Sequence, residues 1–167
     1  MIVDAAWLIN KTIGEVLTPL CEPVHPAWVD VHTTPLATSM AVLRLADGEL
    51  VMLAPSEIER EGERYPSLGL SVEECDPRAL QWVRNGNTHS MNPLVAAAEL
   101  LPLLVSRVEE SDPLGEGAVS EILLFGSNGS RLLFRHIMPP MTLGIDLAKS
   151  GQAPNNSFKP KPLRGSA

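Results

Sequence analysis

Two apolar segments of the chain are each interrupted by a short polar turn. The first segment spans residues 39–55 around an Asp-Gly at 47–48, and the second spans residues 119–136 around an Asn-Gly at 128–129. Both dipeptides favour a two-residue type I′ turn, because such a turn needs two residues that tolerate positive φ. The pattern therefore predicts two antiparallel β-hairpins.

A two-residue turn also fixes which residues face each other across each hairpin. In the first hairpin the predicted pairs are Leu45–Leu50, Leu43–Met52, Ala41–Ala54, Val42–Leu53 and Arg44–Val51. In the second they are Phe125–Leu132, Leu123–Phe134, Leu124–Leu133, Ile122–Arg135 and Glu121–His136. Strands that are apolar on both faces are usually covered by other layers, so we expect one shared antiparallel sheet or half-open barrel.

An Asp or Asn followed by Pro occurs at positions 76–77 and 92–93. This pair is typical of a helix start, because the polar side chain can cap the first turn and proline is tolerated at the first helical position. Apolar residues at helical spacing follow each pair. We predict helices over 77–84, ended by the next Asn-Gly, and over 93–109, which Pro102 kinks or divides.

The predicted fold class is α+β: a sheet or half-open barrel built from the two hairpins and an N-terminal strand, with both helices packed on one face. The N-terminal segment itself is open between a helix over 4–13 and a strand over 12–17. Residues 1–148 are expected to form a single globular domain. Residues 149–167 are rich in Pro, Gly, Ser and Asn, and we expect a disordered tail there.

The 167 residues are 44% hydrophobic and carry a formal net charge of −7. This acidic balance argues against direct nucleic-acid binding, which needs a basic surface. The chain has no basic, apolar leader and no apolar run near the roughly 20 residues that span a bilayer, so we expect a cytoplasmic protein without a membrane partner. Cys21 and Cys75 lack metal-type spacing, and two buried thiols are expected.

The predicted register of the second hairpin places Glu121 opposite His136. A carboxylate beside an imidazole favours the charged form of the histidine and can hold it for proton transfer, so this pair is the candidate catalytic site. A structural ion pair across the two strands explains the same residues. Both interpretations stay open from the sequence.

Candidate ligand- or partner-binding residues are Met138 and Met141, beside two stiff prolines, and Trp82 on the predicted first helix. A cluster of His25, Asp30 and His32 lacks the third or fourth ligand at a diagnostic spacing, so no metal site is predicted. The motifs of phosphate-binding loops, zinc proteases and serine hydrolases are absent from the sequence, and no cofactor is predicted.

Near its end the chain has the sequence Asn-Ser-Phe-Lys-Pro at 156–160, followed by Pro-Leu-Arg-Gly at 162–165. This ending resembles those of small uncharacterised bacterial proteins encoded in integron gene cassettes. The resemblance covers only the tail. It implies a mobile, accessory bacterial gene, and it identifies no catalytic or binding residue in this chain.

The favoured hypothesis is a non-enzymatic accessory binding protein that takes a protein partner or a small apolar ligand between the sheet and the helices. A small enzyme using Glu121 and His136 is one alternative. A toxin-neutralising protein, whose acidic surface meets a basic target, is another.

Overall fold

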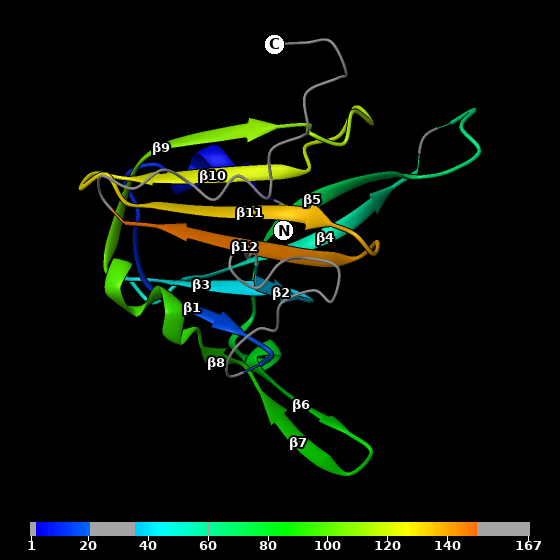
Figure 1. The fold of residues 1–167 in the computed structure, drawn as a ribbon. Coiled ribbons are helices and arrows are strands. Elements are labelled where there is room, and N and C mark those ends of the chain that lie inside the picture. The colour runs from blue at the N-terminus through cyan, green and yellow to red at the C-terminus, as the bar shows by residue number, and fades with distance from the viewer. Residues whose placement is uncertain (1–2, 21–35, 60, 150–167) are drawn as a thin grey trace.

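The structure is a computed structural model, and it describes residues 3–20, 36–59 and 61–149. Nearly all of its regular structure is antiparallel β (Figure 1). The strands are β1 (Thr12–Thr18), β2 (Leu36–Thr38), β3 (Ala41–Leu45), β4 (Leu50–Ile58), β5 (Ser67–Glu74), β6 (Gln81–Arg84), β7 (Asn87–Ser90), β8 (Asn92–Pro93), β9 (Leu103–Ser111), β10 (Glu121–Gly126), β11 (Arg131–Ile137) and β12 (Thr142–Ala148). Three short 3₁₀ helices complete the described elements: η1 (Ala5–Leu8), η2 (Pro77–Leu80) and η3 (Val95–Leu100).

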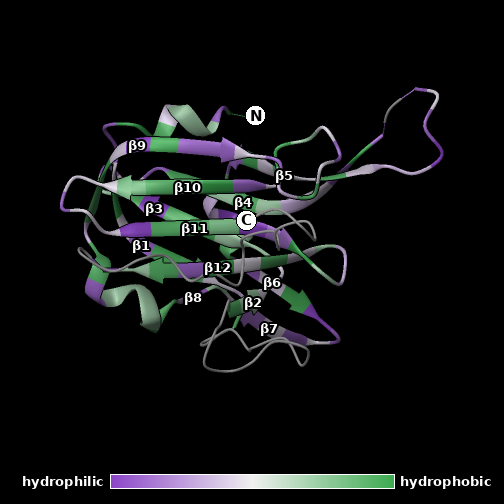
Figure 2. Cartoon of the chain, turned by 45° about the horizontal axis from the view of Figure 1, so that its top comes forward, coloured by the Kyte–Doolittle hydropathy of each residue, from purple (hydrophilic) through white to green (hydrophobic). Residues whose placement is uncertain are grey.

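Ten strands form one sheet in the order β2-β12-β11-β10-β9-β1-β3-β4-β5, with β8 paired to β1 at the side. The sheet bends over, so that β4 and β5 contact β10 and β11 across the interior. Leu53 of β4 and Phe134 of β11 belong to the same buried core, and neither is exposed. In Figure 2 apolar stretches run along the strands, while the connecting loops are largely polar. The hydrophobic core therefore lies between the two halves of one folded sheet.

Both predicted hairpins form, β3 with β4 and β10 with β11, but the predicted registers are wrong by one residue. Leu43 lies opposite Val51, and Leu123 lies opposite Leu133. The cause is a three-residue loop instead of a two-residue one: the Leu45 N–H donates to the Glu49 carbonyl at 2.8 Å, and only Gly48 of that loop has a positive φ, of 92°. A type I turn followed by a glycine bulge uses the same Asp-Gly sequence and shifts the partner strand by one position.

The predicted helix over 77–84 is wrong. Asp76 does cap a helical turn, accepting the Arg78 N–H at 2.8 Å, but that turn is only η2. The chain then enters the β6–β7 hairpin, which is a separate two-stranded sheet. Its turn is formed by Asn85 and Gly86, with φ of 53° and 78°. This Asn-Gly is thus a two-residue hairpin turn with both residues at positive φ, and not the end of a helix.

The predicted helix over 93–109 is also wrong. Pro102 separates η3 from β9, and beyond it the apolar residues alternate instead of following a helical period. Leu103 and Val105 are buried, whereas Leu104 between them is 43% exposed. The described residues contain no α-helix, so the α+β prediction is corrected to a mostly antiparallel β fold. Helical spacing of six apolar residues was outweighed by the proline and by β pairing with β10.

At the N-terminus β1 takes the predicted strand position, and η1 precedes it. The His25, Asp30 and His32 cluster, Cys21 and the cassette-like ending lie outside the described residues, as does the predicted tail except for Lys149. Within the described ranges, no helix has the length and apolar character needed to cross a membrane.

Candidate functional site

The proposed acid–base pair does not come together. Because the register is shifted, Glu121 lies opposite Arg135, and the Arg135 Nε is 3.1 Å from a carboxylate oxygen of Glu121. His136 is the next residue along β11 and therefore points to the opposite face of the sheet. Burial raises the pKa of Glu121, opposed by the attraction of Arg135, with a smaller increase from the neighbouring Glu109. Glu121 thus belongs to a largely buried ion pair.

His136 is fully buried and uses both ring nitrogens in hydrogen bonds. Its Nε2 accepts the Met141 N–H at 2.8 Å, so the proton of the neutral ring lies on Nδ1. Nδ1 in turn donates to the Gly69 carbonyl at 2.8 Å. The ring therefore ties β11 to β5 and to the turn before β12. In this position its role is structural.

The predicted binding residues lie in two separate places. Trp82 is on β6, where its ring stacks on His89 with centroids 5.8 Å apart and an angle of 18°. Met138 and Met141 are on the turn between β11 and β12, in the other sheet, and are 44% and 47% exposed. The structure does not bring these three side chains together into one pocket.

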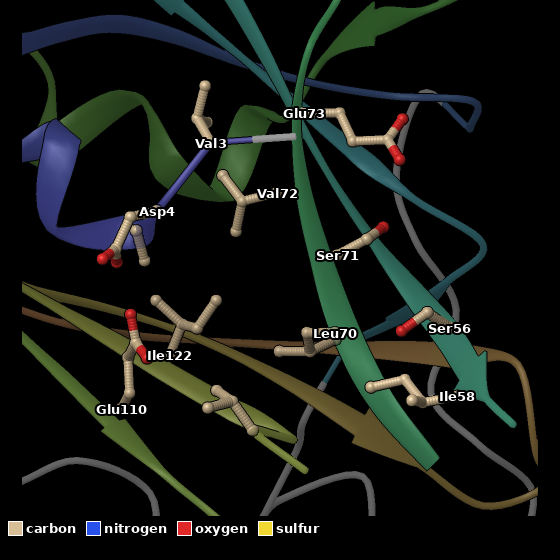
Figure 3. A pocket seen from close by; sticks show the side chains of 12 residues that line it. Val3, Asp4, Ser56, Ile58, Leu70, Ser71, Val72, Glu73, Glu110 and Ile122 are labelled. Carbon is tan, nitrogen blue, oxygen red and sulfur yellow. The ribbon is translucent and has the colours of Figure 1, made fainter. Parts of the chain in front are cut away.

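A cleft that the sequence did not reveal lies at the edge of β5, between η1, β4 and the β9–β10 pair (Figure 3). Its volume is about 460 Å³, within the range of small-molecule sites. Two backbone hydrogen bonds position its walls. The Val3 N–H donates to the Val72 carbonyl at 2.8 Å, and the Leu70 N–H donates to the Val119 carbonyl at 2.7 Å.

Most of the lining is apolar. The side chains that give it this character come from five parts of the chain: Val3, Ala5, Ile58, Leu70, Val72, Val119 and Ile122. Ile58 is 40% exposed although it lies beside this apolar surface. The cleft therefore leaves hydrocarbon surface in contact with water, and a ligand that covered it would gain free energy.

Two carboxyl groups, of Asp4 and Glu110, face each other at the mouth of this cleft (Figure 3). Glu110 lies opposite Ile122 in the β9–β10 pair, and so its side chain leaves β9 on the core-facing side. Asp4 caps η1 by accepting the Ala6 N–H at 3.0 Å. Burial raises the pKa of Glu110, and hydrogen bonding to and repulsion from Asp4 raise it further. Of the described residues that line the cleft, none is a lysine, arginine or histidine.

Sequence reasoning missed Glu110 because it predicted a helix over 93–109 and no strand at this position. Even a predicted strand would have misplaced Glu110, because β9 has an irregular register. The β9–β10 pairing shifts between Phe125 and Gly126, so that the core-facing positions change from Leu103 and Val105 to Val108 and Glu110. Without the shift, alternation from Leu103 would place Glu110 on the outer face. The one feature of the sequence that pointed to this site was Asp4, a polar residue able to cap the apolar turn that follows it.

A scan against protein-family models, a search of curated proteins and a search of solved structures all found no match to this chain. No group of three or more metal-ligating side chains occurs among the residues that the structure describes. The candidate site therefore rests on the geometry of the cleft alone.

Proposed function

We propose that this protein is a non-enzymatic binding protein, and that it holds a small molecule with an apolar body in the cleft beside β5. The observation that carries this proposal is the apolar lining left open to water beside a continuous core. A cleft of this volume, with a mainly apolar lining and a few polar groups, is the usual form of a small-molecule site. The accessory bacterial role implied by the resemblance of the tail belongs to the same proposal.

The position of the candidate acid–base residues favours binding over catalysis. Glu121 is engaged by Arg135, and His136 is enclosed between β11 and β5 with both nitrogens bonded. Neither residue lines the cleft. A general base must be within hydrogen-bond reach of the group it deprotonates, and this arrangement offers no such access.

Titration calorimetry with octan-1-ol tests the proposal, because this probe has an apolar body and no charge. We expect saturable binding by the full chain, with a negative heat-capacity change from burial of apolar surface. Val3→Trp fills the cleft from its η1 side, and Ser56→Trp fills it from β4. Both variants should lose binding.

Val83→Trp is the matched control, because it adds the same side chain on β6, where Val83 is 71% exposed and does not line the cleft. Its octan-1-ol affinity should equal that of the original chain. Equal affinity in all four proteins, or no saturable binding in any, would contradict a ligand site in the cleft. Thermal unfolding of each variant checks that it is folded.

A further inference from the structure

We infer that the ligand of this cleft is a hydrophobic cation, with an apolar body on the Val72 side and a single ammonium group between the Asp4 and Glu110 carboxyls. This inference rests on the function proposed above and adds the charge of the ligand to it. Its basis is the arrangement of the two side chains beside the mainly apolar part of the cleft, whose lining also includes Ser56, Ser71 and Glu73.

Glu110 lies on the side of β9 that faces the core, opposite Ile122. Core-facing positions of a strand are normally apolar, and a carboxylate there loses part of its hydration. Val108, the preceding core-facing residue of β9, obeys this rule and packs against the core. Glu110 departs from it: the side chain leaves β9 on the core-facing side, beside the cleft, and is largely exposed to water there. Residues that break a local rule in this way concentrate at functional sites.

The neighbour of Glu110 in the cleft is a second carboxyl group, that of Asp4. Asp4 is far from Glu110 in the sequence, and η1 brings its carboxyl to face that of Glu110 (Figure 3). Two carboxylates in contact repel each other, and this repulsion is relieved by a shared proton or by a cation. Among the described residues that line the cleft there is no basic side chain, and the proposal therefore takes the cation from the ligand.

The described residues at this site suit an ammonium group better than a metal ion. A divalent ion generally takes several oxygen ligands arranged around it, and the described residues offer no group of three. An ammonium group needs fewer partners, because its three N–H donors can bind two carboxylates and water. The apolar lining next to the pair then suits the hydrocarbon part of an amine.

Three probes with the same eight-carbon tail separate the possibilities: octylammonium, octan-1-ol and octanoate, each titrated calorimetrically into the full chain at neutral pH. We expect octylammonium to bind about tenfold more tightly than octan-1-ol, equivalent to about 1.4 kcal/mol. Octanoate should bind most weakly of the three. About 1 M NaCl should reduce the preference for octylammonium, because salt screens exposed charges.

Glu110→Gln and Asp4→Asn each remove one charge with little change of shape, and asparagine caps a helix as well as aspartate does. In each variant the ratio of octylammonium to octan-1-ol affinity should fall, and it should fall furthest in the double variant, in which Glu73 is the remaining carboxylate among the described lining residues. Glu57→Gln removes an exposed carboxylate that does not line the cleft, and it should retain the ratio of the original chain.

The outcomes distinguish the two proposals. Equal binding of octylammonium and octan-1-ol, blocked by Val3→Trp, would support the binding function and overturn the cationic ligand. Failure of all three probes would overturn both. A preference for octylammonium that Glu57→Gln weakens as much as Glu110→Gln does would assign it to net charge and overturn the role of the carboxyl pair.

Discussion

The Nδ1 of His136 donates a hydrogen bond of 2.8 Å to the carbonyl of Gly69, joining β11 to β5 across 67 residues of sequence. The same edge of β5 is bonded to the loop before β10, where Glu116 accepts the Leu68 N–H at 3.0 Å. We call this contact between β5 and residues 116–120 and 136 the seam. It holds the β5 end of the folded sheet against β11 and the loop before β10, next to the candidate cleft.

Replacing His136 tests the seam directly. His136→Phe keeps a buried ring of similar size but removes both hydrogen bonds, which leaves the Gly69 carbonyl and the Met141 N–H to find other partners. We expect the free energy of unfolding to fall by about 2–4 kcal/mol, since each unsatisfied group costs about 1–3 kcal/mol. Urea denaturation measures it. His89→Phe, on the exposed β6–β7 hairpin, should change stability by no more than about 0.5 kcal/mol.

Gly69 is needed for the close approach of strands at the seam. An added Cβ would lie 3.0 Å from the Val119 carbonyl oxygen and 3.2 Å from the Cβ of Ala118. Gly69→Ala should therefore lower the free energy of unfolding by about 1–3 kcal/mol. Gly14→Ala is the control, because the nearest atom to its Cβ is the Arg44 carbonyl oxygen at 3.6 Å. If both substitutions cost the same, the steric account of the seam is wrong.

The raised pKa of Glu110 predicts a pH dependence of stability. The folded state holds the Glu110 proton more tightly than the unfolded state, so stability falls as pH rises from the usual glutamate pKa through the raised one. Glu110→Gln removes this loss. We expect the variant to gain up to about 0.5 kcal/mol at neutral pH, a small value because the side chain is largely exposed.

At a pH below the usual glutamate pKa, the variant and the original chain should be equally stable. Urea denaturation at acidic and neutral pH provides the comparison, with Glu57→Gln measured in parallel. A gain for Glu110→Gln that is as large at acidic pH as at neutral pH would show that the effect does not come from titration of this carboxyl.

For the Glu121–Arg135 pair, removing the carboxylate alone should lower the free energy of unfolding more than removing both charges does. The Arg135 side chain is only 9% exposed, so Glu121→Ala leaves a buried cation without its main carboxylate and should cost about 1–3 kcal/mol. Burial lowers the pKa of Arg135, although Glu121 opposes this. In the Glu121→Ala, Arg135→Met double variant the cost should be smaller than in Glu121→Ala alone, because no buried charge remains. Additive costs in a double-mutant cycle would rule out this coupling.

The Asn85–Gly86 turn predicts a local effect on the β6–β7 hairpin. Gly86→Val places a β-branched residue at a φ of 78°, a strain of about 1–3 kcal/mol. Trypsin should then cleave after Arg84 about tenfold faster, because this separate hairpin opens more often. The thermal midpoint of the body should not move. Asn85→Gly tolerates the turn and should be cleaved at the original rate.

The sequence by itself determined where the chain turns. Its Asp-Gly and Asn-Gly pairs lie in turns between paired strands, and Asp76 caps a helical turn as expected. Each of these features depends on the local conformational preferences of a few neighbouring residues. The type of each turn was not determined, because a glycine bulge and a type I′ turn accept the same dipeptides.

Only the tertiary structure decided the registers, the strand β9 and the cleft. A one-residue difference in loop length moved Glu121 from His136 to Arg135, and a shift in the β9–β10 pairing turned Glu110 toward the core. The apolar residues around Val105 fit a helix as well as a strand until β10 supplies their hydrogen-bond partners. Long-range pairing of this kind is a property of the assembled sheet, and no short window of sequence contains it.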